Sequence, residues 1–106
     1  MANICENKFH IYCDDSEIIK TIEKKLDDLF QETLDGEIDY VTENTIEGYF
    51  DSRWDFPDDI FNTFFDEFSD DSLYMRCLSE EYGCNLVAMN VYSDGFWKES
   101  QYFDLY

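Results

Sequence analysis

Apolar and polar residues alternate near the start of the chain, and this pattern predicts a β-strand over residues 7–13. One side of this strand consists of Phe9, Ile11 and Cys13, and the other side consists of Lys8, His10 and Tyr12. Apolar residues then recur every three or four positions, which predicts a helix over 16–34: Ile19, Ile22, Leu26, Leu29 and Phe30. Asp14 or Ser16 can cap its start, and Gly36 suits a left-handed cap after its end.

Later segments repeat this order of strand and helix. The β-type residues over 37–54 predict one or two strands, the second of them over 45–53. Pro57 marks the start of a second helix with Asp55 as its cap. The apolar stripe of that helix is Ile60, Phe61, Phe64, Phe65 and Phe68. Further strands are expected over 72–78 and 85–92, and residues 97–105 can form a last edge strand. The turn between the first two can bring Cys77 close to Cys84.

This order of elements predicts a single α+β domain over residues 1–106. The expected architecture is a two-layer sandwich, with two helices on a mostly antiparallel sheet of four to five strands. The ferredoxin-like arrangement belongs to this class. With 44% hydrophobic residues, the chain can bury one core.

Charge changes this picture from an ordinary small domain to one with an unusual surface. The chain carries 26 Asp and Glu against 7 Lys and Arg, a formal net charge of −19. Ten Phe, eight Tyr and two Trp accompany these charges, whereas acidic disordered segments are poor in aromatic residues. We therefore expect a folded body whose negative surface attracts basic partners.

No motif for catalysis, metal binding or phosphate binding is present. The adjacent carboxylates suit helix caps and solvated charge, His10 has no partner pattern, and the four cysteines lack the close spacing of zinc ligands. We expect no enzyme activity and no cofactor. The chain has no apolar run that indicates a signal peptide or a membrane span, so a cytoplasmic location is expected.

The segment from Phe50 to Asp71, FDSRWDFPDDIFNTFFDEFSDD, resembles the YubB-type ferredoxin-like domain of phage and plasmid accessory proteins. The matching positions are structural: Phe50, Trp54, Pro57 and Phe68, with Asn7-Lys8-Phe9 and Gly83 outside the segment. The similarity covers about half of the chain and departs from the family pattern at Phe56. It implies a ferredoxin-like fold and an origin in a mobile element, and it carries over no catalytic residue.

Direct binding to nucleic acid is disfavoured, because few basic residues are dispersed in a strongly negative chain. Duplex DNA carries one negative charge per about 1.7 Å of its axis, so a net charge of −19 corresponds to about 32 Å of duplex. This correspondence favours an inhibitor that mimics nucleic-acid charge. The expected partner is a basic nucleic-acid-binding host protein: a CRISPR effector, a restriction enzyme or a nucleoid protein. The candidate contact residues lie on the two helices and their flanking turns: Asp27, Asp28, Glu32, Asp35, Asp58, Asp59, Asp66, Glu67, Asp70 and Asp71. Exposed aromatic residues such as Tyr49, Tyr82 or Trp97 are expected to anchor such a contact.

Two other interpretations remain open. The acidity can serve solubility alone, or the domain can be a protein–protein interaction module without mimicry. Such a module would dock through an uncovered sheet face or through the last strand.

Overall fold

The computed structural model describes residues 4–32, 34–53, 58–68, 70–81, 86–93 and 95–104, with side chains for 5–32, 34–52, 60–68, 70–80, 87–93 and 95. The elements follow one another along the chain as strand, helix, two strands, helix and three strands. They are β1 (Ile4–Tyr12), α1 (Ser16–Glu32), β2 (Asp35–Val41), β3 (Thr45–Arg53), α2 (Asp58–Phe65), β4 (Tyr74–Glu81), β5 (Leu86–Ser93) and β6 (Phe96–Asp104).

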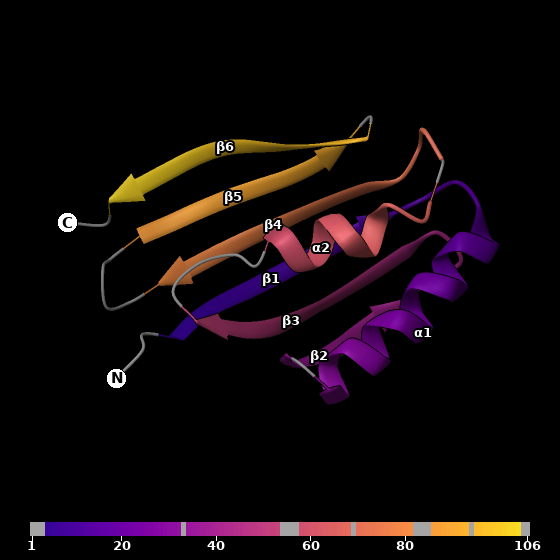
Figure 1. Cartoon of the computed structure of the whole chain (residues 1–106), viewed down its shortest axis with the longest axis horizontal. Helices are drawn as coiled ribbons and strands as arrows, with labels where there is room; N and C mark the ends of the chain where they lie inside the picture. Colours follow the sequence, from indigo (N-terminus) through magenta and orange to yellow (C-terminus); the bar gives the residue numbers. More distant parts are fainter. Residues whose placement is uncertain are drawn as a thin grey trace.

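The described strands form one sheet with the order β2-β3-β1-β4-β5-β6, and each neighbouring pair is antiparallel (Figure 1). The predicted α+β class is therefore confirmed. Six strands are present in the described part, above the four to five expected. Both segments that the sequence left open, 35–41 and 96–104, are paired strands.

Both helices lie on the same face of the sheet (Figure 1). α1 packs on β2 and β3, and the predicted apolar stripe turns inward, since Ile19, Ile22 and Leu26 are buried. The ring of Phe50 lies 5.4 Å from that of Phe61 on α2, so the two helices share one core. Burial of such aromatic and aliphatic side chains is the main favourable term in folding.

The core extends beyond the helices along the sheet. On α2, Phe61, Phe64 and Phe65 are buried, as the stripe predicts. The ring of Phe65 stacks on that of Tyr92 in β5, with the ring centroids 4.8 Å apart. This contact ties the second half of the sheet to the helix layer.

Two predicted caps are wrong. The Oδ1 atom of Asp15, rather than a side chain of Asp14 or Ser16, accepts the backbone N–H of Glu17 at 2.9 Å at the start of α1. Gly36 lies inside β2 opposite Phe50, where a Cβ atom would come within 2.6 Å of the Phe50 Cβ. The chain thus needs glycine at this position for close packing and not for a left-handed turn. The predicted caps and helix start at Asp55 and Pro57 lie outside the described residues.

A buried polar cluster sits within the apolar layer, centred on Asn7, which is fully buried. Its Nδ2 atom donates to the backbone oxygen of Phe50 at 3.1 Å and to the Oγ of Ser52 at 3.0 Å. Its Oδ1 atom accepts the hydroxyl of Ser79 at 2.6 Å. The cluster links β1, β3 and β4, and it satisfies a polar side chain whose burial would otherwise be costly.

Candidate functional site

The described acidic side chains lie at the surface, and none of them is buried. Of the ten acids predicted as contact residues, seven have exposed side chains: Asp27, Asp28, Glu32, Asp35, Asp66, Glu67 and Asp71. Asp70 is half-buried, and the side chains of Asp58 and Asp59 lie outside the described part. Apart from Asp35, the described candidates form two groups on the helix side of the sheet.

The first group, which we call the α1–β2 acidic group, consists of Asp27, Asp28 and Glu32 at the end of α1, just before β2. Asp35 does not belong to it: the next residue, Gly36, packs toward the helices against Phe50, so Asp35 faces the other side of the sheet. The last turn of α1 contains no basic residue. Carboxylates near a helix C-terminus oppose the helix dipole. Asp28 and Glu32 are also four positions apart, where like charges repel. These acids therefore reduce the stability of the helix that carries them.

The second group, the α2–β4 acidic group, consists of Asp66, Glu67, Asp70 and Asp71. Glu67 forms an ion pair with Lys25 of α1, whose ammonium lies 5.5 Å from the centre of the Phe68 ring. The hydroxyl and backbone N–H of Ser72 donate to Asp70 and lower the pKa of its carboxyl. Because these two acids have partners within the fold, the second group is less free for an external contact than the first.

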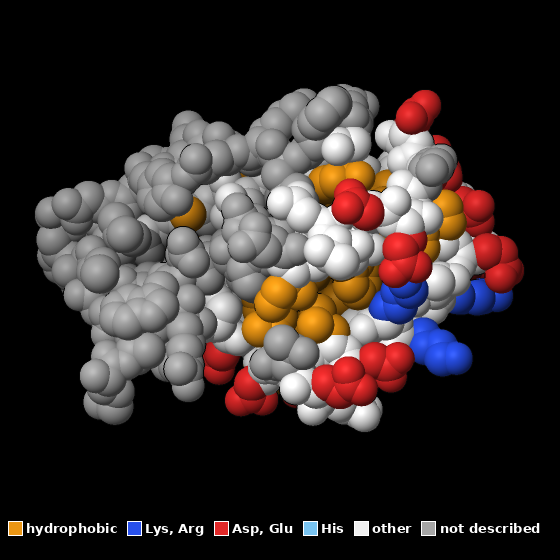
Figure 2. All heavy atoms as spheres, in the orientation of Figure 1, with side chains coloured by type: hydrophobic (Ala, Val, Ile, Leu, Met, Phe, Trp, Pro, Cys, Tyr) orange, Lys and Arg blue, Asp and Glu red, His pale blue; other side chains and the backbone are white. Residues whose placement is uncertain are grey.

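An apolar strip separates the two acidic groups. Figure 2 shows hydrophobic side chains at the surface between the two helices, with Asp and Glu side chains beside them. The partly buried apolar side chains of the helices and the turn after α2 are Ile18, Leu29, Phe30, Ile60 and Phe68. An apolar centre with a charged rim is the usual composition of a protein–protein interface. We call this surface, the strip with both acidic groups, the helix-side surface.

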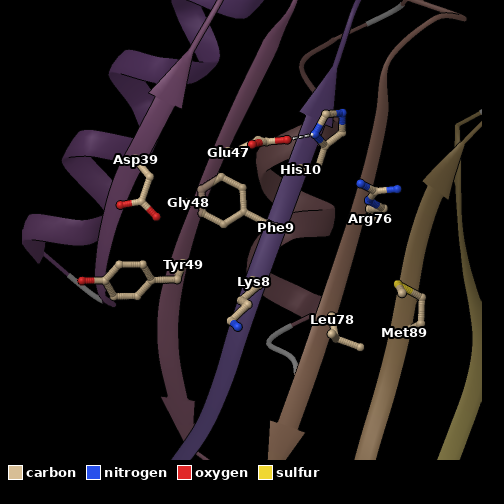
Figure 3. A pocket seen from close by; sticks show the side chains of 10 residues that line it. All are labelled: Lys8, Phe9, His10, Asp39, Glu47, Gly48, Tyr49, Arg76, Leu78 and Met89. Atoms are coloured by element: carbon tan, nitrogen blue, oxygen red, sulfur yellow. Dashed lines mark hydrogen bonds and ion pairs between the residues drawn. The ribbon is translucent and has the colours of Figure 1, made fainter.

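The opposite face of the sheet contains a hollow of about 500 Å³ (Figure 3). The described elements include no helix on this face (Figure 1). His10 pairs with Arg76 across β1 and β4, and Lys8 pairs with Leu78 in the same ladder. Their side chains line the hollow together with Met89 of β5. The sequence correctly places Lys8 and His10 on the polar side of the first strand, but it gives no sign that Arg76 joins them, because strand pairing is not readable from composition.

Ion pairing distinguishes the basic side chains of the hollow. The Nδ1 atom of His10 lies 2.7 Å from the Oε1 atom of Glu47. Among the described residues, neither Lys8 nor Arg76 has a carboxylate within ion-pair distance. From the sequence alone, the basic residues are expected to be dispersed. For Lys8 and Arg76 this is wrong, since they lie on adjacent strands in one hollow.

Asp39 and Glu47 border the hollow toward β2 and β3, and further acids lie on the same face of the sheet. The hydroxyl of Tyr49 donates to the Oε2 atom of Glu37 at 3.0 Å, and this hydrogen bond to a carboxylate raises the pKa of the phenol. Burial, with the negative charges of Glu6 and Asp35, raises the pKa of Asp51. Tyr49 is 42% exposed, as predicted, but it lines the hollow on the open face, so its predicted role as an anchor beside the helix acids is wrong. The side chains of Tyr82 and Trp97 lie outside the described part.

The described cysteines are buried free thiols: Cys5, Cys13 and Cys77. Burial raises the pKa of Cys77 to about 12, so this thiol is protonated at neutral pH. Its expected neighbour Cys84 lies outside the described residues. No group of three or more His, Cys, Asp or Glu among the described side chains is arranged to hold a metal ion. Neither α1 nor α2 has the length and apolar content needed to cross a bilayer.

Comparisons with known proteins return no match: no protein family, no curated protein and no solved structure is similar to this chain.

Proposed function

We propose that this protein is a non-enzymatic inhibitor encoded by a phage or plasmid, which mimics nucleic-acid charge and acts in the host cytoplasm. Its partner is a basic nucleic-acid-binding host protein: a CRISPR effector, a restriction enzyme or a nucleoid protein. The helix-side surface would block the groove in which that partner holds DNA or RNA. The observation that carries the proposal is the placement of seven described candidate acids at the helix side of the molecule, in two groups beside an apolar strip.

Charge density supports this proposal. A net charge of −19 on a body 41 Å long corresponds to one charge per about 2.2 Å, compared with one per 1.7 Å of duplex DNA. A basic groove that binds a duplex would therefore meet a similar charge over a similar length. Such complementarity accelerates association and makes binding sensitive to salt.

The position of the α1–β2 acidic group gives a second argument. Acids at helix starts and in turns have a structural explanation, because they cap free N–H groups. Asp28 and Glu32 have no such explanation, since they oppose the dipole of α1 and repel each other. A chain that retains a destabilising arrangement at an exposed surface commonly does so for binding.

We also propose that the unit from β1 to β4 is ferredoxin-like. Its element order is strand, helix, strand, strand, helix, strand, and its strands lie in the order β2-β3-β1-β4. β5 and β6 would then be an extension at the β4 edge. This arrangement supports the resemblance to YubB-type domains and, through it, the proposed origin in a mobile element.

The proposal is tested by affinity capture from lysates of candidate bacterial hosts, at about 0.1 M and about 1 M salt, with and without competing duplex DNA. We expect a nucleic-acid-binding protein to be captured at low salt and to be displaced by both DNA and high salt. The double substitution Asp28→Asn/Glu32→Gln should weaken capture. Glu17→Gln/Glu43→Gln removes the same charge from exposed sites outside the helix-side surface and should change capture much less.

The alternative is a protein–protein interaction module without mimicry. Capture of a partner that survives high salt, resists DNA competition and tolerates the Asp28→Asn/Glu32→Gln substitutions would favour this alternative and reject mimicry. Equal loss of capture in both double variants would show that net charge matters and the helix-side surface does not.

A further inference from the structure

We propose that the hollow on the open face of the sheet is a binding site for a small organic anion, one that carries a single carboxylate or phosphate group on an apolar body. The site is separate from the helix-side surface, and the proposal is independent of the proposed function. Its central residues are Lys8, His10 and Arg76, with Leu78 and Met89 beside them (Figure 3).

Charge placement is the first argument. The chain has only seven Lys and Arg and one His. Lys8 and Arg76 occupy diagonal positions across β1 and β4, which lie roughly 7–8 Å apart in such a ladder. The other diagonal positions around Lys8 hold the acids Glu47, Asp51 and Glu80. Acids are abundant in this protein, yet within the described residues neither cation has a carboxylate partner. An anion placed between Lys8 and Arg76 would give both cations a charge partner.

The second argument is the chemistry of the three side chains. The Arg76 guanidinium can hold a carboxylate or phosphate through two parallel hydrogen bonds, and Lys8 adds a point charge. The Nδ1 atom of His10 faces Glu47 at 2.7 Å, so the ring orientation is fixed. Because a carboxylate only accepts, this contact places the ring proton on Nδ1, so Nε2 of the neutral ring is an acceptor and adds no donor for an anionic group. Arg76 and Lys8 thus combine charge and hydrogen-bond direction at one place.

The surroundings limit the size and type of the ligand. Leu78 and Met89 provide apolar contact on the β4–β5 side, whereas Asp39 and Glu47 border the β2–β3 side with negative charge. A polyanion would meet this negative border, but a ligand with one anionic group and an apolar body would not. A volume of about 500 Å³ lies within the usual range for small-molecule sites.

The experiment is a titration of the ¹⁵N-labelled full chain followed by amide NMR, with hexanoate as the probe. Hexanol serves as the neutral analogue of similar shape. We expect saturable shifts at the amides of Lys8, His10, Arg76 and Leu78, with a dissociation constant on the order of 10 mM for a ligand of this size. Inorganic phosphate should bind at the same amides more weakly, since it has no apolar body.

Three substitutions make the test specific. Arg76→Gln and Lys8→Gln should each raise the dissociation constant for hexanoate about tenfold. Lys24→Gln is the matched control, because Lys24 is an exposed lysine on α1 without an ion pair in the described part. It should change the dissociation constant by less than about twofold. The dispersion of the amide spectrum reports whether each variant is folded.

Several results would overturn the assignment. Shifts that do not saturate, or that include the amides of Lys20 and Lys24 equally, would indicate unspecific ion binding. Equal shifts with hexanol would show that the anionic group is not recognised. Tighter binding of a single-stranded oligonucleotide at the same amides would assign the face to nucleic acid instead.

Discussion

The position of Glu32 at the end of α1 leads to a prediction that separates binding from stability. Its carboxylate is exposed, lies in a last turn without a basic residue, and is four positions after Asp28. Removing the charge relieves repulsion by the helix dipole, worth about 0.3–1 kcal/mol, and by Asp28, worth about 0.2–0.5 kcal/mol. We therefore expect Glu32→Gln to raise the free energy of unfolding by roughly 0.5–1.5 kcal/mol.

The matched control is Glu17→Gln, the same substitution in the first turn of the same helix. There the carboxylate favours the dipole and lies 3.5 Å from the Lys20 ammonium, so its removal should lower stability. Urea unfolding at about 0.01 M salt measures both effects, and about 1 M salt should reduce both. If Glu32→Gln lowers stability, or if its gain is unchanged at high salt, the electrostatic explanation of the α1–β2 acidic group is wrong.

Three further predictions concern the fold. Asn7→Ala should lower the free energy of unfolding by about 3 kcal/mol, because several buried polar groups lose their partner; a change below about 1 kcal/mol in urea unfolding would contradict this. Gly48→Ala should lower the free energy of unfolding by about 1–3 kcal/mol and expose the β2 amides to hydrogen exchange, because a Cβ atom would lie 2.3 Å from the backbone oxygen of Glu37. Unchanged protection of the β2 amides would refute this prediction. Burial raises the pKa of the Asp51 carboxyl in the folded protein. The stability that this group contributes is therefore present below its unfolded pKa and is lost as the pH rises through its folded pKa. For Asp70, whose pKa the Ser72 hydrogen bonds lower, the contribution is present above the unfolded pKa and is lost as pH falls through the folded pKa. At neutral pH, Asp51→Asn should therefore stabilise the fold and Asp70→Asn should destabilise it. Urea unfolding midpoints measured from about pH 3 to 7 test this, and midpoints that shift in the same direction for both variants would reject the assignment.

Periodicity in the sequence predicts the core of this fold well. The stripe from Ile19 to Phe30 and the stripe from Ile60 to Phe68 both turn toward the sheet, because a helix can bury only one side of its surface. The strand over 45–53 matches β3 residue for residue. These elements carry their own pattern and need no information about their neighbours.

Features that depend on pairing could not be predicted in the same way. Asn7 reads as a polar residue at a strand start, yet the register places it against Ser79 and beside Ser52, which makes it a core residue. Gly36 follows a helix in the sequence and looks like a cap, but β2 begins one residue earlier and uses it for close packing. The hollow exists only because β1 and β4 are neighbours, which brings Arg76 beside His10 across 65 intervening residues.

The cations of the hollow also bear on which face a basic partner would use. Lys8 and Arg76 would repel such a partner at the centre of the open face, although Asp39 and Glu47 border them, whereas the acids of the helix-side surface would attract it. The double substitution Lys8→Gln/Arg76→Gln makes the whole chain more negative but leaves the helix-side surface unchanged. If the partner binds on the helix side, affinity should rise only slightly, through a long-range effect that about 0.15 M salt largely screens. A large gain that persists at this salt concentration would place the partner on the open face, because only a direct contact escapes screening.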